Sequence, residues 1–72
     1  KDHKSALVLY QEAEKLEPNN LQLKYNMGLL LVELNRYSEA KVYAVEVYSA
    51  KFPLPGLKRK LKEKGYWEDG PL

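Results

Sequence analysis

The sequence contains no cysteine and only one histidine, one methionine and one tryptophan. Without cysteine, the segment has no disulfide framework, thiolate zinc site or thiol nucleophile. The single histidine, His3, stands near the N-terminus, where packing or solvent exposure is a better explanation than chemistry. Neither a glycine-rich phosphate loop nor metal-ligand spacing occurs. The sequence therefore predicts no enzymatic activity, no catalytic residue, no cofactor and no metal site.

Long hydrophobic runs are also missing. No run approaches the roughly 20 apolar residues that a membrane-spanning helix needs, and the first residues lack the pattern of a signal peptide. The 72 residues form at most one small domain. Their net charge of +2 is uneven: residues 1–52 carry seven basic and seven acidic side chains, whereas residues 53–72 carry five and three. The basic excess lies entirely in the C-terminal part, and the sequence indicates no compartment.

What the chain does contain is a near-repetition at a spacing of 34 positions, the separation of Ala6 from Ala40. The positions that recur in this way are Ala6, Tyr10, Ala13 and Pro18, which correspond to Ala40, Ala44, Val47 and Phe52. Pro53 then follows one place later than Pro18 would require. A period of about this length is typical of helix-turn-helix units that bury their apolar face by stacking on copies of themselves.

Two blocks of sequence carry a resemblance to a known family. Tyr25-Asn26-Met27-Gly28 and Asn35-Arg36-Tyr37-Ser38-Glu39-Ala40 resemble the signature of the tetratricopeptide repeat, and Leu16 to Asn20 resembles its inter-repeat turn. The resemblance implies an all-α fold of antiparallel helix hairpins, a fragment of a right-handed superhelix with a C-terminal capping helix. Its signature positions here are Ala6, Tyr10, Ala13, Pro18, Met27, Gly28, Tyr37, Ala40, Ala44 and Val47.

The register divides the chain into three segments. Residues 1–18 are expected to be the second helix of a partial repeat, residues 19–53 a complete repeat, and residues 54–72 a capping helix with a frayed tail. The chain then begins inside a repeat and marks the end of an array.

The spacing of apolar residues predicts four helices. The first runs from about Asp2 to Leu16, with Glu12, Glu14 and Glu17 forming a solvated surface and a buried stripe made of Ala6, Leu9, Tyr10, Ala13 and Leu16. The second runs from Leu21 to Leu34 after an N-cap at Asn20, with a buried side made of Leu23, Met27, Leu30, Leu31 and Leu34.

The third helix is expected from Tyr37 or Ser38 to about Lys51, although its segment 42–48 is rich in strand-favouring residues. The fourth is expected from Pro55 or Leu57 to Lys64, because proline suits a first helical turn and Gly65 suits a helix stop. Its inward side is expected to consist of Leu54, Leu57, Leu61 and Trp67.

Three positions are expected to have special structural roles. Gly28 and Ala40 are small enough to let the helices of the complete repeat cross closely. A glycine within a helix lowers helix stability by roughly 1 kcal/mol relative to alanine, so a close crossing would explain its presence. Asn35 should take the left-handed conformation at a helix end. Lys24 and Ala44 replace large residues of the family and are expected to thin the packing.

The resemblance implies a protein–protein interaction scaffold whose first helices line a groove for a peptide or helix of a partner. The matching positions are Gln22, Tyr25, Asn26, Leu29, Val32 and Glu33. Asn26 is the leading candidate, because an amide can donate to and accept from a peptide backbone, although an ordinary surface position or a hydrogen bond between repeats explains it equally well. The stripe of Tyr25, Leu29 and Val32 is expected to be a docking surface for a neighbouring helix rather than a ligand site. A basic clamp for a terminal carboxylate is not expected.

Two alternatives remain for the partner. The basic fourth helix, with a net charge of +4 from Leu57 to Gly65, could bind nucleic acid or an anionic surface, but lysines on a polar cap explain it better. The chain could also self-associate through its first helix and the apolar stripe. Protein or peptide partners are favoured over both.

Overall fold

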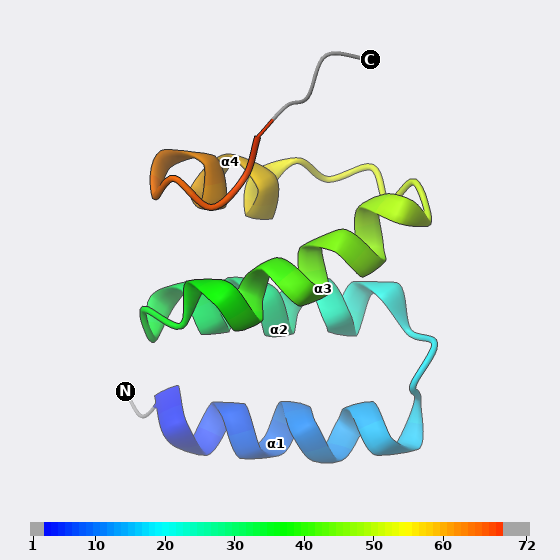
Figure 1. Ribbon diagram of the computed structural model, residues 1–72. Coiled ribbons are helices and arrows are strands. Elements are labelled where there is room, and N and C mark those ends of the chain that lie inside the picture. Colours follow the sequence, from blue (N-terminus) through cyan, green and yellow to red (C-terminus); the bar gives the residue numbers. More distant parts are fainter. Residues whose placement is uncertain (1–2, 69–72) are drawn as a thin grey trace.

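The computed structural model describes residues 3–68 and consists of four helices joined by short connections (Figure 1). These are α1 (His3–Leu16), α2 (Leu21–Glu33), α3 (Tyr37–Ser49) and α4 (Gly56–Glu63). No strand occurs within these 66 positions, and the all-α prediction is confirmed, including the strand-favouring part of α3. The helix start expected at Asp2 and most of the expected frayed tail lie outside the described residues.

The helix ends follow local signals. Asn20 caps α2, because its side-chain oxygen accepts a hydrogen bond from the Leu23 N–H at 3.0 Å. Asn35 (φ 61°) and Gly65 (φ 82°) take the left-handed conformation that the sequence predicts. Lys51 (φ 63°) does so as well after α3, although lysine gives no sequence signal for it.

Helix α2 is central and packs against all three other helices (Figure 1). Helix α1 lies on one side of the α2–α3 pair and α4 on the opposite side. The most deeply buried side chains come from the three helices that pack together, and they are Met27, Leu31, Ala40, Ala44, Val47, Leu57 and Leu61. The core thus lies between α2, α3 and α4, and α1 is attached to its side.

The predicted buried stripe of α1 is wrong at two positions. Leu9 is 71% exposed and Leu16 is 84% exposed, whereas Leu7 is buried. The reason is that α2 is the helix whose backbone lies close to α1, while α3 reaches α1 through the Tyr43 hydroxyl. The side of α1 that carries Leu9 and Leu16 has no helix against it in the described part of the chain.

The predicted burial of α2 also needs correction. Leu23, Leu30 and Leu34 are only half-buried, while Tyr25 and Val32 are buried. The ring of Tyr25 stacks on Phe52 with 4.9 Å between centroids. Because α2 has α3 and α4 on two different sides, it buries a wider arc than one stripe. A neighbouring element is expected from the sequence against the stripe that contains Tyr25, and Phe52 of the same chain provides this contact.

Gly28 is required by a different contact from the predicted one. A Cβ atom built at Gly28 would lie 2.5 Å from Cδ2 and 3.2 Å from Cδ1 of Leu57 on α4, and none of its three nearest atoms belongs to α3. Leu57 is completely buried, so its methyl groups have little room to move. The absent side chain at Gly28 therefore makes space for α4 on α2, and the expected close approach to Ala40 on α3 stays a prediction.

Tyr48 of α3 holds the connection that leads into α4. Its hydroxyl donates to the Leu54 carbonyl oxygen at 2.7 Å and accepts from the Lys58 N–H at 3.1 Å. Trp67 packs edge-on against the same ring, with 5.5 Å between centroids. Leu54 itself is 44% exposed, so its expected inward packing is wrong. The backbone oxygen of Leu54, rather than its side chain, attaches this connection to α3.

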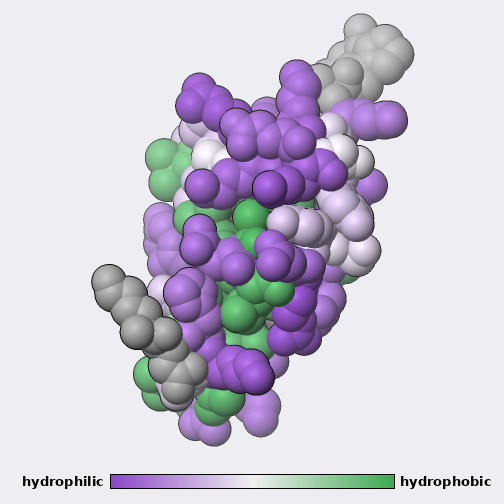
Figure 2. All heavy atoms as spheres, turned by 90° about the vertical axis from the view of Figure 1, so that its left-hand side faces the viewer, coloured by the Kyte–Doolittle hydropathy of each residue, from purple (hydrophilic) through white to green (hydrophobic). Residues whose placement is uncertain are grey.

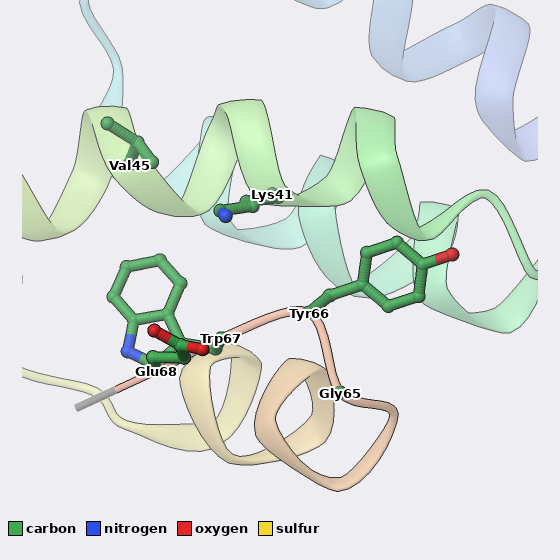
Figure 3. A pocket seen from close by; sticks show the side chains of 6 residues that line it. All are labelled: Lys41, Val45, Gly65, Tyr66, Trp67 and Glu68. Carbon is green, nitrogen blue, oxygen red and sulfur yellow. The ribbon is translucent and has the colours of Figure 1, made fainter. Parts of the chain in front are cut away.

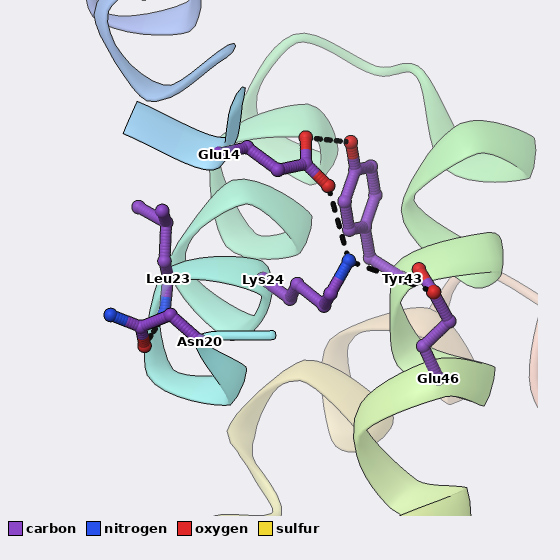
Figure 4. A network of polar contacts seen from close by, with 6 residues as sticks. All are labelled: Glu14, Asn20, Leu23, Lys24, Tyr43 and Glu46. Carbon is purple, nitrogen blue, oxygen red and sulfur yellow. Dashed lines mark hydrogen bonds and ion pairs between the residues drawn. The ribbon is translucent and has the colours of Figure 1, made fainter. Parts of the chain in front are cut away.

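A polar network joins α1, α2 and α3 (Figure 4). Glu14 accepts from the Tyr43 hydroxyl at 2.8 Å and pairs with the Lys24 ammonium at 3.2 Å. The same ammonium lies 3.6 Å from Glu46. Glu14 is half-buried and therefore does not belong to the solvated surface that the sequence predicts. Lys24 stands where the family has a large residue, and it contacts its neighbours through ion pairs with Glu14 and Glu46.

The Tyr43 hydroxyl is strongly perturbed by this environment. Burial, followed by the hydrogen bond to Glu14 and the carboxylate's negative charge, raises the pKa of Tyr43 to about 12. The neutral hydroxyl is the form that the folded chain stabilises. Its contribution to stability is fully present below the unfolded-state pKa of about 10 and is lost as the pH rises toward 12.

We predict that Gly28→Leu lowers the free energy of unfolding by at least about 1 to 3 kcal/mol, because the new side chain overlaps Leu57. In a Leu57→Ala background the same change should cost clearly less, since the obstructing methyl groups are gone. Urea unfolding of the four variants in this cycle measures the difference. An equal cost in both backgrounds would contradict the assigned contact.

We also predict that Tyr43→Phe destabilises the fold by roughly 1 kcal/mol at pH 8, because it removes the hydrogen bond to Glu14. The stability difference between wild type and Tyr43→Phe should shrink as the pH rises above 10, since only the wild type loses the tyrosine contribution. Urea unfolding at pH 8, 10 and 11 tests this. A difference that stays constant with pH would show that the hydroxyl does not titrate as assigned.

Candidate functional site

Four of the six predicted groove residues share one accessible side of α2. Gln22 and Glu33 are exposed, and Asn26 and Leu29 are half-buried, at steps of three or four positions along the helix. The remaining two, Tyr25 and Val32, are buried, so a bound molecule cannot reach them. The accessible part of the predicted groove is therefore narrower and more polar than the sequence suggests.

The side of α2 that carries Asn26 borders a hollow of about 360 Å³. Residues of three helices line it: Ala6, Tyr10, Asn26, Leu29, Leu30, Glu33 and Lys60. A second hollow continues from it and shares Glu33 and Lys60. On the side of the molecule that lies at the left of Figure 1, hydrophobic atoms form a band between hydrophilic side chains (Figure 2). We call the hollow lined by Asn26, Leu29, Glu33 and Lys60 the α2–α4 face.

Asn26 is held in place within this face by a neighbour on its own helix. The Gln22 amide nitrogen donates to Asn26 Oδ1 at 3.1 Å. The carbonyl oxygen keeps a second lone pair, and the Asn26 amide nitrogen makes no hydrogen bond within residues 3–68. The side chain can therefore donate two hydrogen bonds and accept one more from a bound molecule.

Opposite charges stand at the edge of the α2–α4 face. Glu33 lies 3.6 Å from His3 Nε2 and is largely exposed, so a bound group can still reach it. Lys60 reaches the face from α4. Lys60 was not expected to be a groove residue, although the sequence contains a signal for it. Lys60 stands 34 positions after Asn26, the same spacing that relates Leu57 to Leu23.

Other cations of α4 are engaged with aromatic rings of α3. The Lys58 ammonium lies 5.2 Å from the centre of the Tyr48 ring, and the Lys64 ammonium lies 5.9 Å from that of Tyr37. Both are cation–π geometries that fix the lysines against the domain. The basic residues of α4 thus point to more than one side of the helix, which gives less support to a single anion-binding surface.

A further hollow of about 470 Å³ lies between α3 and the segment that follows α4 (Figure 3). Its side chains include Lys41 and Val45 from α3 and Trp67 and Glu68 from the C-terminal segment. None of the predicted site residues lies here. The two charged groups are of opposite sign, and the lining offers no arrangement of nucleophile and base.

Within residues 3–68, no group of three acidic, histidine or cysteine side chains is placed to hold a metal ion. In the same range, no helix combines the length and the apolar character that crossing a membrane requires.

Comparison with protein families identifies the tetratricopeptide repeat, whose model matches residues 1–44, or 44 of the 72 residues. Comparison with curated proteins and with solved structures gave no match. Repeats of this family generally act as scaffolds for protein–protein interaction and are typically not enzymes. The matched region spans α1, α2 and the first part of α3. The chain therefore belongs to the tetratricopeptide repeat family.

Proposed function

We propose that this chain is a protein-interaction module that holds an extended segment of a partner protein on its α2–α4 face. The observation that carries the proposal is the Asn26 side chain, which is accessible in a hollow and has unused hydrogen-bonding capacity. An extended peptide presents N–H and C=O groups that an amide side chain matches at the same time. The general role of the family supports the same conclusion.

The surroundings of Asn26 suit a peptide. Leu29 and Leu30 provide an apolar floor for one side chain of the partner. Glu33 and Lys60 give the hollow one negative and one positive group, which favours one direction of the peptide over the other. The hydrogen-bonding groups of Asn26 and the two charges are suited to holding a peptide.

We further propose that residues 54–72 act as a cap on the complete repeat, residues 19–53. The supporting observation is that Leu57 and Leu61 are completely buried while the basic side chains of α4 stay outside the core. A polar outer surface over an apolar inner one is what the end of a repeat stack requires. On the partial repeat, residues 1–18, Leu9 and Leu16 stay exposed, and no element among residues 3–68 covers them.

We predict that Asn26→Ala weakens binding of peptides selected on the wild-type chain from a random display library. The loss should be roughly three- to thirtyfold, because one or two hydrogen bonds to the peptide backbone disappear. Asn19→Ala is the matched control, since Asn19 is exposed in the turn between α1 and α2, away from the hollow. Isothermal titration of the selected peptides with each variant gives the affinities.

Equal affinities for Asn26→Ala and Asn19→Ala would rule out Asn26 as the contact that carries binding. A binding preference for nucleic acid over every selected peptide, falling steeply with added salt, would favour the alternative function of the basic helix.

A further inference from the structure

The hollow between α3 and the segment that follows α4 plays no part in the proposed peptide binding (Figure 3). We call it the α3 hollow and define it by its lining residues, Lys41, Val45, Gly65, Tyr66, Trp67 and Glu68. It encloses about 470 Å³ and shares no lining residue with the α2–α4 face. Ligand sites in proteins enclose roughly 300 to 1,000 Å³. The α3 hollow is therefore large enough to hold part of a second partner segment.

The α3 hollow arises where the chain departs from the repeat pattern. Residues 65–68 correspond to residues 31–34, 34 positions earlier, where α2 is still helical up to Glu33, whereas α4 already ends at Glu63. Leu7, which corresponds to Lys41, is buried, but Lys41 is exposed. A further helix of a repeat stack placed here would bury the Lys41 ammonium, which is costly without a paired anion. The hollow is therefore unsuited to another helix of an array.

Two aromatic rings of the hollow are held in place by rings of α3. Trp67 packs edge-on against Tyr48 with 5.5 Å between centroids, and Tyr66 lies against Tyr37 with 5.2 Å between centroids. Figure 3 shows the Tyr66 and Trp67 side chains directed to opposite sides along α3, with Lys41 between them. Because both rings are already fixed, a ligand that packs on them loses little side-chain entropy on binding.

The polar groups of the hollow are mainly hydrogen-bond donors. The Trp67 indole N–H makes no hydrogen bond within residues 3–68, and no side-chain nitrogen in this range is both buried and without a partner. A bound molecule can therefore reach this N–H. Lys41 is exposed and has no polar partner in the same range. Both groups only donate, and the one carboxylate of the lining belongs to Glu68.

We propose that the α3 hollow binds a proline-rich segment of a partner protein, in the polyproline II conformation, with an arginine or lysine beside its prolines. Such a segment has no internal hydrogen bonds, so its carbonyl oxygens are free to accept from Trp67 and Lys41. Prolines lack an N–H group, so the segment needs few acceptors in return. Its pyrrolidine rings pack on aromatic side chains, and the charge of Glu68 attracts the basic residue. A helix matches these donors poorly, because its carbonyl oxygens are already hydrogen-bonded.

The probe is a synthetic peptide of about ten prolines with one arginine at each end. Trp67 is the only tryptophan, so the NMR spectrum of the full chain contains one indole N–H signal that reports on this hollow. Titration with the peptide should shift this signal in a saturable way, because the indole gains a hydrogen-bond acceptor. A flexible glycine–serine peptide of the same length with the same arginines is the matched control and should shift it far less.

Two variants test the donors. Trp67→Phe keeps an aromatic ring against Tyr48 but removes the N–H, so binding should weaken at least about threefold. Lys41→Met removes the ammonium, keeps the apolar stem and should cost about as much. Lys15→Met changes an exposed lysine of α1 outside the lining and should leave the affinity unchanged. Backbone N–H signals of residues 65–68 measure binding in each variant, including the one without an indole.

The charge of Glu68 is tested by exchanging the ends of the peptide. The arginine-flanked peptide should bind about two- to fivefold more tightly than one flanked by glutamines, as expected for a partly solvated ion pair. Glu68→Gln should abolish this preference, whereas Glu12→Gln, at an exposed position of α1, should retain it. A preference that survives Glu68→Gln would contradict the assigned role of Glu68.

Three outcomes would overturn the inference as a whole. These are an indole signal that does not move, an equal shift with the glycine–serine peptide, and equal affinities of Trp67→Phe and Lys15→Met. A shift of the indole signal on concentrating the chain without peptide would assign the hollow to a second copy of the chain instead. Asn26→Ala should leave binding of the proline peptide unchanged, so that failure here and failure of the proposed peptide site are distinguishable.

Discussion

The contact between Leu57 and Gly28 is the constraint on which the arrangement of the other helices depends. Only a residue without a side chain leaves room on α2 for Leu57, since a Cβ atom there would lie 2.5 Å from a methyl carbon. With α4 in that position, Leu61 is buried, and Tyr25 lies under Phe52. The same position brings Lys60 to the hollow beside Asn26. The roughly 1 kcal/mol that glycine costs within a helix is offset by this packing.

The two sides of the molecule are closed by different kinds of interaction. The α4 side is apolar, with Leu57 and Leu61 completely buried. Helix α1 contributes only Leu7 to the buried core and is joined to α2 and α3 through the carboxylate of Glu14. Ion pairs of partly exposed groups are worth less than apolar burial of whole side chains. The attachment of α1 is therefore the less stable one, and its outer side leaves Leu9 and Leu16 exposed.

The sequence predicted the features that depend on local chemistry. The four helices, the cap at Asn20 and the left-handed residues Asn35 and Gly65 all follow from residues close to each other in the chain. Lys51 was missed, because nothing in lysine favours a positive φ; the structure around it, where Phe52 N–H donates to the Val47 carbonyl oxygen, imposes the conformation.

The predictions that failed concern which neighbours each helix has. Leu9 and Tyr25 both occupy apolar positions on amphipathic helices, yet Leu9 is exposed and Tyr25 is buried, since a helix covers only the second. Periodicity gives the direction of an apolar side but not the presence of a partner against it. Lys60 was missed for a related reason, because the basic composition of the fourth helix does not show which of its lysines lies beside α2.

The chemistry of the α2–α4 face limits how selective a single repeat can be. An amide such as Asn26 recognises groups that every peptide backbone carries, so it contributes affinity more than discrimination. Selectivity has to come from the side chain that meets Leu29 and Leu30 and from the charges that meet Glu33 and Lys60. One apolar contact and two partly solvated charges distinguish partners by only a few kcal/mol at most.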